Sequence, residues 1–208
     1  MKKIFIFSLF VSMCMGVNAQ LATSQSNITY RTVIEEPSQP KTYTGWNSLY
    51  VEYLPSKLHS QSFTGAALNY GHAFAVTQKL PLFVETGLGG QYSFFKEDGF
   101  KTQFASVKVP LNVIYEYVIP GTSISLDPYA GARLRVNVWG QYESDYGEYD
   151  LFDDDEGFGK RVQVGWQAGL KVRFNNAFFV GGSYGTDFMD FSPESKISEA
   201  TVSLGVTF

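Results

Sequence analysis

The sequence predicts an all-β protein: an eight-stranded antiparallel up-and-down transmembrane β-barrel, preceded by a cleaved signal peptide. Three observations predict it. The chain starts with an export signal, long segments alternate apolar and polar residues, and Phe, Tyr and Trp make up 16% of the residues. After the signal, no apolar run reaches the about 20 residues that a membrane-spanning helix needs. An exported chain of this kind is a soluble β protein or a closed barrel, because lipid leaves no partner for an open sheet edge.

Residues 1–19 are predicted to be the signal peptide. They combine a basic start, an apolar run from Ile4 to Met15 and a small residue, Ala19, at the expected cleavage point. The run is too short for a spanning helix. Cys14 is the only cysteine, so we expect the mature chain to contain no disulfide.

The rest of the chain changes texture once. Residues 20–44 are rich in Ser, Thr, Gln and Pro and lack a sustained period, which predicts a flexible periplasmic leader. Residues 45–208 alternate apolar and polar positions between turn residues and are predicted to form the barrel domain.

Eight strands are expected in this domain. In the fourth, the odd positions from Ala105 to Tyr117 are almost all apolar, whereas Lys108 and Glu116 occupy even positions. In the fifth, Arg133 and Arg135 alternate with leucine and valine in the same way. In order, the expected strands are 46–54, 63–76, 81–95, 102–118, 123–139, 160–174, 177–189 and 197–208.

The connections alternate in length, as expected for a barrel in the outer membrane. Short turns are predicted at 77–80, 119–122 and 175–176, and longer loops at 55–62, 96–101, 140–159 and 190–196. In a meander these two sets lie on opposite rims, and the short turns of outer-membrane barrels are periplasmic. A soluble sandwich would alternate similarly. However, the expected strands exceed the usual 5–6 residues, and aromatic residues gather near strand ends, as in a membrane interface.

The segments "VKVPLNVIYEY", "LDPYAGARL" and "GWQAGLKVRF", together with the terminal Phe208, resemble the porin-like family of small outer-membrane β-barrel proteins over residues 45–208. The resemblance implies the outer membrane of a Gram-negative cell, contact with its lipid, and no single shared chemistry. The alternating Leu204, Val206 and Phe208 are similar to the signal that the barrel-assembly machinery recognises during biogenesis.

Charged residues at the inward positions predict a plugged lumen. Eight strands enclose only enough space for side chains or one small ligand, and buried charges are tolerated when paired. Basic residues outnumber acidic ones in this set, so an anion or water is expected to complete the network. The predicted lumen charges are Glu52, Glu85, Lys108, Glu116, Asp127, Arg133, Arg135, Arg161, Lys171 and Arg173. Pro110, which has no N–H to donate, is predicted to sit at a β-bulge.

Other candidate sites have weaker support. The loop 140–159 is predicted to be a solvated surface loop, and its acidic run, whose oxygen ligands would suit calcium, is only a weak candidate metal site because its glycine does not match EF-hand spacing. Its candidate ligands are Asp150, Asp153, Asp154, Asp155 and Glu156. His59 lies near Ser60, but nothing in the spacing orients a catalytic pair, and His72 is expected to be structural. We therefore expect no catalytic residue, no cofactor and no enzyme activity.

The sequence favours a structural or surface-interaction role through the extracellular loops. The loop 140–159 is the expected contact for an extracellular partner, and the protein is expected to be a monomer. Transport of a small or hydrophobic solute is the alternative, and a lipid-modifying barrel enzyme is the third. The net charge of −4 argues against nucleic acid as a partner.

Overall fold

The computed structural model describes residues 42–208 with gaps at 59–60, 98–99, 145–146, 153–158 and 192–195. The predicted signal and most of the predicted leader therefore lie outside the described residues. No helix in the described ranges is long and apolar enough to cross a membrane. The strands are β1 (Trp46–Leu58), β2 (Gln61–Ala75), β3 (Leu82–Glu97), β4 (Phe100–Tyr115), β5 (Tyr117–Val118), β6 (Ile124–Ser144), β7 (Gly147–Asp150), β8 (Val162–Phe174), β9 (Phe178–Asp187) and β10 (Ile197–Thr207).

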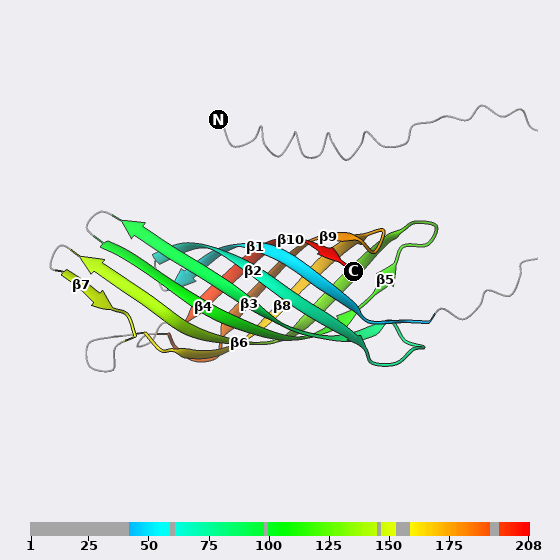
Figure 1. The fold of residues 1–208 in the computed structure, drawn as a ribbon, viewed down its shortest axis with the longest axis horizontal. Coiled ribbons are helices and arrows are strands. Elements are labelled where there is room, and N and C mark those ends of the chain that lie inside the picture. Colours follow the sequence, from blue (N-terminus) through cyan, green and yellow to red (C-terminus); the bar gives the residue numbers. More distant parts are fainter. Residues whose placement is uncertain (1–41, 59–60, 98–99, 145–146, 153–158, 192–195) are drawn as a thin grey trace, which may run out of the picture. The chain divides into compact units, whose positions relative to one another are not determined.

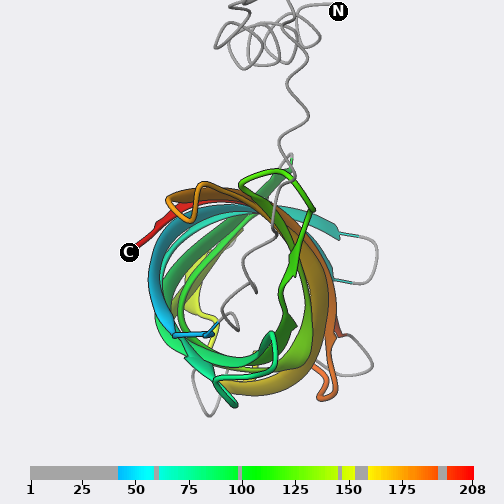
Figure 2. The same ribbon diagram turned by 90° about the vertical axis from the view of Figure 1, so that its right-hand side faces the viewer.

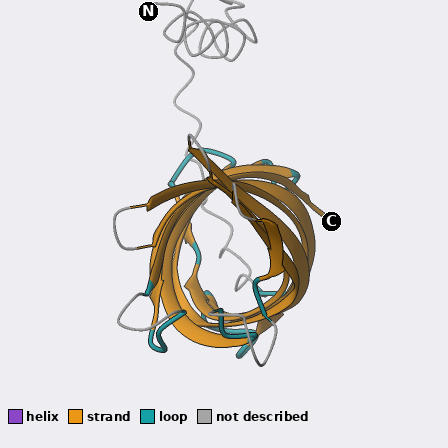
Figure 3. Cartoon of the chain, turned by 90° about the vertical axis from the view of Figure 1, so that its left-hand side faces the viewer, coloured by secondary structure: helices purple, strands orange, loops and turns teal. Residues whose placement is uncertain are grey.

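Eight of these strands form a closed antiparallel barrel, as predicted. Each long strand pairs with its neighbours in the order β4-β3-β2-β1-β10-β9-β8-β6, and a β4–β6 ladder completes the ring. The two end views show this closed wall (Figures 2 and 3). The two short strands both pair with β6. β5 pairs with the first residues of β6, and β7 forms a hairpin with its last residues.

The wall is apolar outside and polar inside. Outward positions such as Val51, Leu68, Leu111 and Val202 are more than half exposed. Inward positions on the same strands are buried and, in the middle of the barrel, mostly polar, as Ser106, Lys108 and Asn112 of β4 show. This is the reverse of a water-soluble sandwich, in which the apolar faces would meet as the core.

Aromatic side chains mark two belts on the outer face. Tyr53, Tyr92 and Trp139 lie in one row across neighbouring strands. Ala66 pairs with both Tyr53 and Tyr92, and Ala105 pairs with both Tyr92 and Trp139. A second set lies near the short turns and comprises Phe74, Tyr115, Tyr117, Phe178 and Phe208, all exposed. Such belts are typical of the two membrane interfaces.

The two rims differ, but not in the predicted way. The short turns, the start of β1 and the end of β10 share one rim, at the right of Figure 1. On the opposite rim, the predicted loops 55–62 and 96–101 are mostly strand, because β1 and β2, like β3 and β4, continue almost to their connection. The first part of 140–159 is likewise the β6–β7 hairpin. The β1–β2, β3–β4 and β6–β7 connections are therefore largely strand extensions past the aromatic belt, whereas the described residues of the connections after β7 and β9, including those of the predicted loop 190–196, are not strand.

The predicted bulge at Pro110 is wrong. Pro110 pairs in register with Arg133 of β6. On its other side, the β3–β4 ladder has no pairs at Val109 and Pro110, so the missing N–H is accommodated by a gap in the ladder. The register shift lies elsewhere: Ala105 pairs with Trp139 and Ser106 with Asn137, which leaves Val138 as the extra residue.

Candidate functional site

The lumen of the barrel is filled by three successive groups of side chains. Nearest the short turns, the Arg173 guanidinium lies 2.7 Å from Glu116 and 3.0 Å from Asp127. Its other face covers the Trp46 ring, 4.0 Å from the ring centroid. All three charged side chains are at least nine-tenths buried, so each depends on these partners to replace water.

The middle of the lumen is organised around Lys171. Its ammonium group lies 2.6 Å from a Glu85 carboxylate oxygen. Three aromatic rings, those of Tyr50, Tyr129 and Phe179, surround it at 5.2 to 5.3 Å. The second Glu85 oxygen accepts a hydrogen bond from Asn112 at 3.0 Å. The Lys171 charge is thus neutralised by the Glu85 carboxylate and further stabilised by the aromatic rings.

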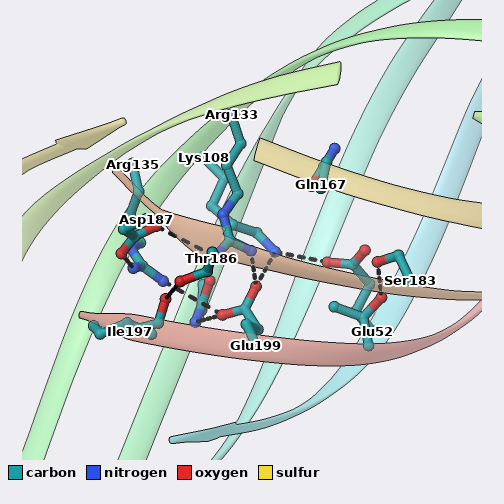
Figure 4. A network of polar contacts seen from close by, with 12 residues as sticks. Glu52, Lys108, Arg133, Arg135, Gln167, Ser183, Thr186, Asp187, Ile197 and Glu199 are labelled. Carbon is teal, nitrogen blue, oxygen red and sulfur yellow. Dashed lines mark hydrogen bonds and ion pairs between the residues drawn. The ribbon is translucent and has the colours of Figure 1, made fainter. Parts of the chain in front are cut away.

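The largest ionic group centres on Glu199 of β10, and Figure 4 shows its contacts. Its carboxylate lies 2.7 Å from Arg133, 3.4 Å from Arg135 and 4.0 Å from Lys108. Asp187 of β9 pairs with the same two arginines. The Glu199 side chain is 0% exposed, so all of its solvation comes from the protein.

Two apolar clusters lie at the two ends of these ionic groups. At the short-turn end, Phe83 and Ile114 are buried and pack with Tyr43 and Trp46. At the opposite end, inward side chains from β1, β2, β4 and β10 meet side chains from the connections after β7 and β9. This outer cluster comprises Leu58, Phe63, Phe104, Leu151, Phe152, Phe191 and Ile197.

Phe152 is fitted into the outer cluster by two glycines. A Cβ on Gly140 would lie 2.5 Å from the Phe152 ring, and one on Gly159 would lie 2.8 Å from it. These distances are too short for any side chain, so glycine is needed at both positions. The ring is 3% exposed. Leu151 and Phe152, which directly follow β7, are therefore packed into the barrel mouth.

A cavity of about 310 Å³ opens at the short-turn end beside Tyr43, Glu116 and Arg173, but the space described between the ionic groups is small. A cavity of about 20 Å³ lies between the Lys171 and Lys108 groups, lined by Glu52, Glu85 and Tyr129 among others. A water molecule needs about 10–15 Å³ of such space. The cavity therefore accommodates about one water and no larger solute.

Nine of the ten predicted lumen charges point into the barrel: Glu52, Glu85, Lys108, Glu116, Asp127, Arg133, Arg135, Lys171 and Arg173. Arg161 does not: it is exposed, precedes the start of β8 and lies over the Phe152 ring at 5.6 Å. Asp187 and Glu199 were not among the predicted lumen charges, although the alternation of the last two strands places them inward. With these changes, the described lumen has six acidic and five basic groups, and the predicted positive excess is wrong.

The remaining candidates form no site among the described residues. Asp153, Asp154, Asp155, Glu156 and His59 lie outside them. Asp150 is exposed, and its carboxylate accepts a hydrogen bond from the Phe152 backbone N–H at 2.8 Å. His72 faces outward near the short-turn rim, 2.7 Å from Asn47. Within the described ranges, no three metal-ligating side chains come together.

Leu204, Val206 and Phe208 all lie on the outer face of the closing strand and its end. Their exposed fractions are 47%, 48% and 68%. Backbone hydrogen bonds of 2.8 and 3.1 Å join Phe208 to Asn47 of β1. The three side chains therefore point away from the lumen.

Solved structures with a similar fold are small bacterial outer-membrane barrels. Ail, the attachment invasion locus protein of Yersinia pestis, crystallised with the heparin analogue sucrose octasulfate, matches with a TM-score of 0.50 at 18% identity, over 80% of this chain and 100% of Ail. Neisserial surface protein A matches with a TM-score of 0.50 at 14% identity, over 79% of this chain and 97% of its own. This protein has the fold of the small outer-membrane β-barrel proteins.

The likeness extends to the fold alone at these identities. The outer membrane enzyme PagL is also similar, with a TM-score of 0.49 at 12% identity, over 76% of this chain and 98% of PagL. No protein-family model and no curated protein matches the sequence.

Proposed function

We propose that this protein is a closed barrel of the bacterial outer membrane that conducts nothing through its lumen and acts at the cell surface through its strand extensions. The observation that carries the proposal is the lumen itself. An apolar cluster lies at each end, and the groups between them are paired charges at hydrogen-bond distance. A polar solute would have to break all three groups to pass.

The outer face supports the location. Exposed aliphatic side chains lie between two aromatic belts, which is the surface that lipid requires of a spanning barrel. The fold shared with Ail and Neisserial surface protein A supports the same location.

The surface available for partners is the rim with the strand extensions. The β6–β7 hairpin presents Glu143, Glu148, Tyr149 and Asp150 to solvent. Glu143 and Glu148 lie directly opposite each other, and Lys101 pairs with Glu143 at 3.4 Å. Because the hairpin is acidic, it suits a neutral or basic partner better than a polyanion such as the heparin analogue bound to Ail.

A shortened hairpin tests the proposal. Residues 143–148 are replaced by Asn-Gly, a two-residue turn that suits a β-hairpin, so the pairs Tyr142–Tyr149 and Gln141–Asp150 and the Phe152 seal are kept. We expect the variant to assemble normally but to lose surface partners captured by cross-linking on intact cells. Lys79→Ala, on the opposite rim, is the control. An unchanged set of partners together with altered solute uptake would overturn the proposal in favour of transport.

A further inference from the structure

The seam between the first and last strands closes the barrel, and its register is not set by the outer face. Native pairing puts Val51 opposite Leu204 and Tyr53 opposite Val202. A slip of two residues would still place one apolar residue beside another, because outward positions of β10 from Ala200 to Val206 are all apolar. Lipid contact therefore does not distinguish the native register from its two-residue neighbours.

The backbone ladder of the seam is also interrupted. Pairs run from Ser48–Thr207 to Leu58–Ile197, but Leu54 and Pro55 have none with β10. Pro55 does pair with Thr64 of β2, so its missing N–H is on the seam side. On the inner face, the uncharged pairs of the seam are Ser48–Thr207, Tyr50–Gly205 and Leu58–Ile197, and Ser203 and Ser56 lie opposite the two glutamates.

The ionic group of the lumen lies beside this interruption and reaches both strands. Lys108, from β4 on the opposite wall, lies 2.7 Å from Glu52 of β1 and 4.0 Å from Glu199 of β10. Figure 4 shows the lysine between the two carboxylates. Glu199 is held further by Arg133 and Arg135 of β6.

We infer that Lys108, held between Glu52 and Glu199, fixes the register in which the first and last strands close the barrel. A one-residue slip of β10 would turn Glu199 toward lipid. A two-residue slip would move its carboxylate by about 6.8 Å along the strand and separate it from all three cations. The seam accepts several registers on its lipid face but only one in the lumen.

Two charge-neutral double variants test this inference. Lys108→Met with Glu52→Gln removes the ion pair that joins β4 to β1, the first strand of the seam. Lys171→Met with Glu85→Gln is the control, because that pair also lies in the lumen, with side chains 9% and 1% exposed against 9% and 11%, but joins β8 to β3. Each removes one positive and one negative charge, so neither residue of the replaced pair is left as a lone charge, and Glu199 keeps Arg133 and Arg135 in the Lys108 variant.

Register is measured by disulfide trapping in a Cys14→Ser background, after assembly of the full chain in cell membranes. Val51→Cys is combined with cysteine at Leu204, the native partner, or at Val202 or Val206, the slipped partners. Native opposite positions are close enough to bridge and diagonal ones are not. The parent and the Lys171 variant should cross-link only Val51→Cys with Leu204→Cys.

The Lys108 variant should give slipped cross-links beside the native one, or lose the folded form that resists unfolding in unboiled gel samples. The same outcome for both double variants would overturn the inference, whether both keep the native cross-link alone or both fail to fold. The result does not depend on the proposed surface role.

Discussion

Glu199 illustrates how individual residues hold this barrel together. Its carboxylate is fully buried and accepts hydrogen bonds from Arg133, Arg135 and Gln91. Arg133 and Arg135 lie on β6, and Gln91 lies on β3. Arg135 also donates hydrogen bonds to Asp187 and Gln163. Removing any one cation leaves the buried Glu199 carboxylate with fewer charges to offset its loss of water. Breaking such a buried pair lowers the free energy of unfolding strongly.

Replacement of Arg133 tests that dependence. Arg133→Met keeps the apolar stem and removes the charge that pairs with Glu199 at 2.7 Å and Asp187 at 3.3 Å. We expect the free energy of unfolding, measured by urea titration in lipid vesicles, to fall by about 3–5 kcal/mol. Lys101→Ala breaks a surface pair whose side chains are 42% and 60% exposed, and should cost about 0–1 kcal/mol. Equal losses would contradict the role of burial.

Phe152 gives a second test at this scale. Its ring is buried against Phe191, with centroids 6.1 Å apart. Phe152→Ala should lower the free energy of unfolding by about 3–5 kcal/mol, as for a core phenylalanine. Phe100→Ala, at the same rim but 48% exposed, should lose clearly less. A comparable loss in the two variants would show that the outer cluster is not a packed core.

Strands and their connections define which rim faces outward. The β6–β7 hairpin and the 76–81 turn lie at opposite ends of the barrel (Figure 1). Because short turns are periplasmic in outer-membrane barrels, the hairpin should lie outside the cell. Glu148→Cys should therefore react with a membrane-impermeant thiol reagent on intact cells, whereas Lys79→Cys should react only after the outer membrane is permeabilised. The opposite labelling pattern would invert the orientation.

We expect the Phe208 side chain to contribute more to assembly of the barrel than to packing in the folded barrel. Phe208→Ala keeps the backbone bonds to Asn47 but removes an outward ring that is 68% exposed. Phe178→Ala removes an outward ring that is 45% exposed, from β9 on the same rim. If Phe208 belongs to the assembly signal, only its replacement should lower the fraction of chains that reach the folded, heat-modifiable form in cells. Equal yields of the two variants would remove Phe208 from that signal.

At the scale of the whole molecule, the sequence predicts those parts of the barrel wall that separate lipid from lumen, because residues there alternate with a period of two. Alternation located eight strands and nine of the lumen charges, because a misplaced residue would face the wrong solvent. Arg161 escaped this rule because it lies just before β8, where the wall no longer separates two environments. The outer cluster could not be predicted, since Leu151 and Phe152 come from a connection without a period. The Pro110 bulge was wrong because a gap in one ladder suffices.

The side chains that fill the described lumen support the proposal that the barrel is closed to solutes. The ionic groups and the two apolar clusters belong to one stack of side chains along the barrel axis. Their positions come from alternate residues of all eight long strands or from connections packed on them. Any route for ions would need several buried pairs to separate together, each at a cost of several kcal/mol.

Conductance in planar lipid bilayers tests this account most directly. The purified, folded protein, inserted at low density in salt solution under an applied voltage, should give little or no steady current. Neither Arg133→Met nor Phe152→Ala alone should open it, because the other groups of the stack remain. Large, reproducible open-channel steps from the unaltered protein would contradict the closed lumen and favour transport over a surface role.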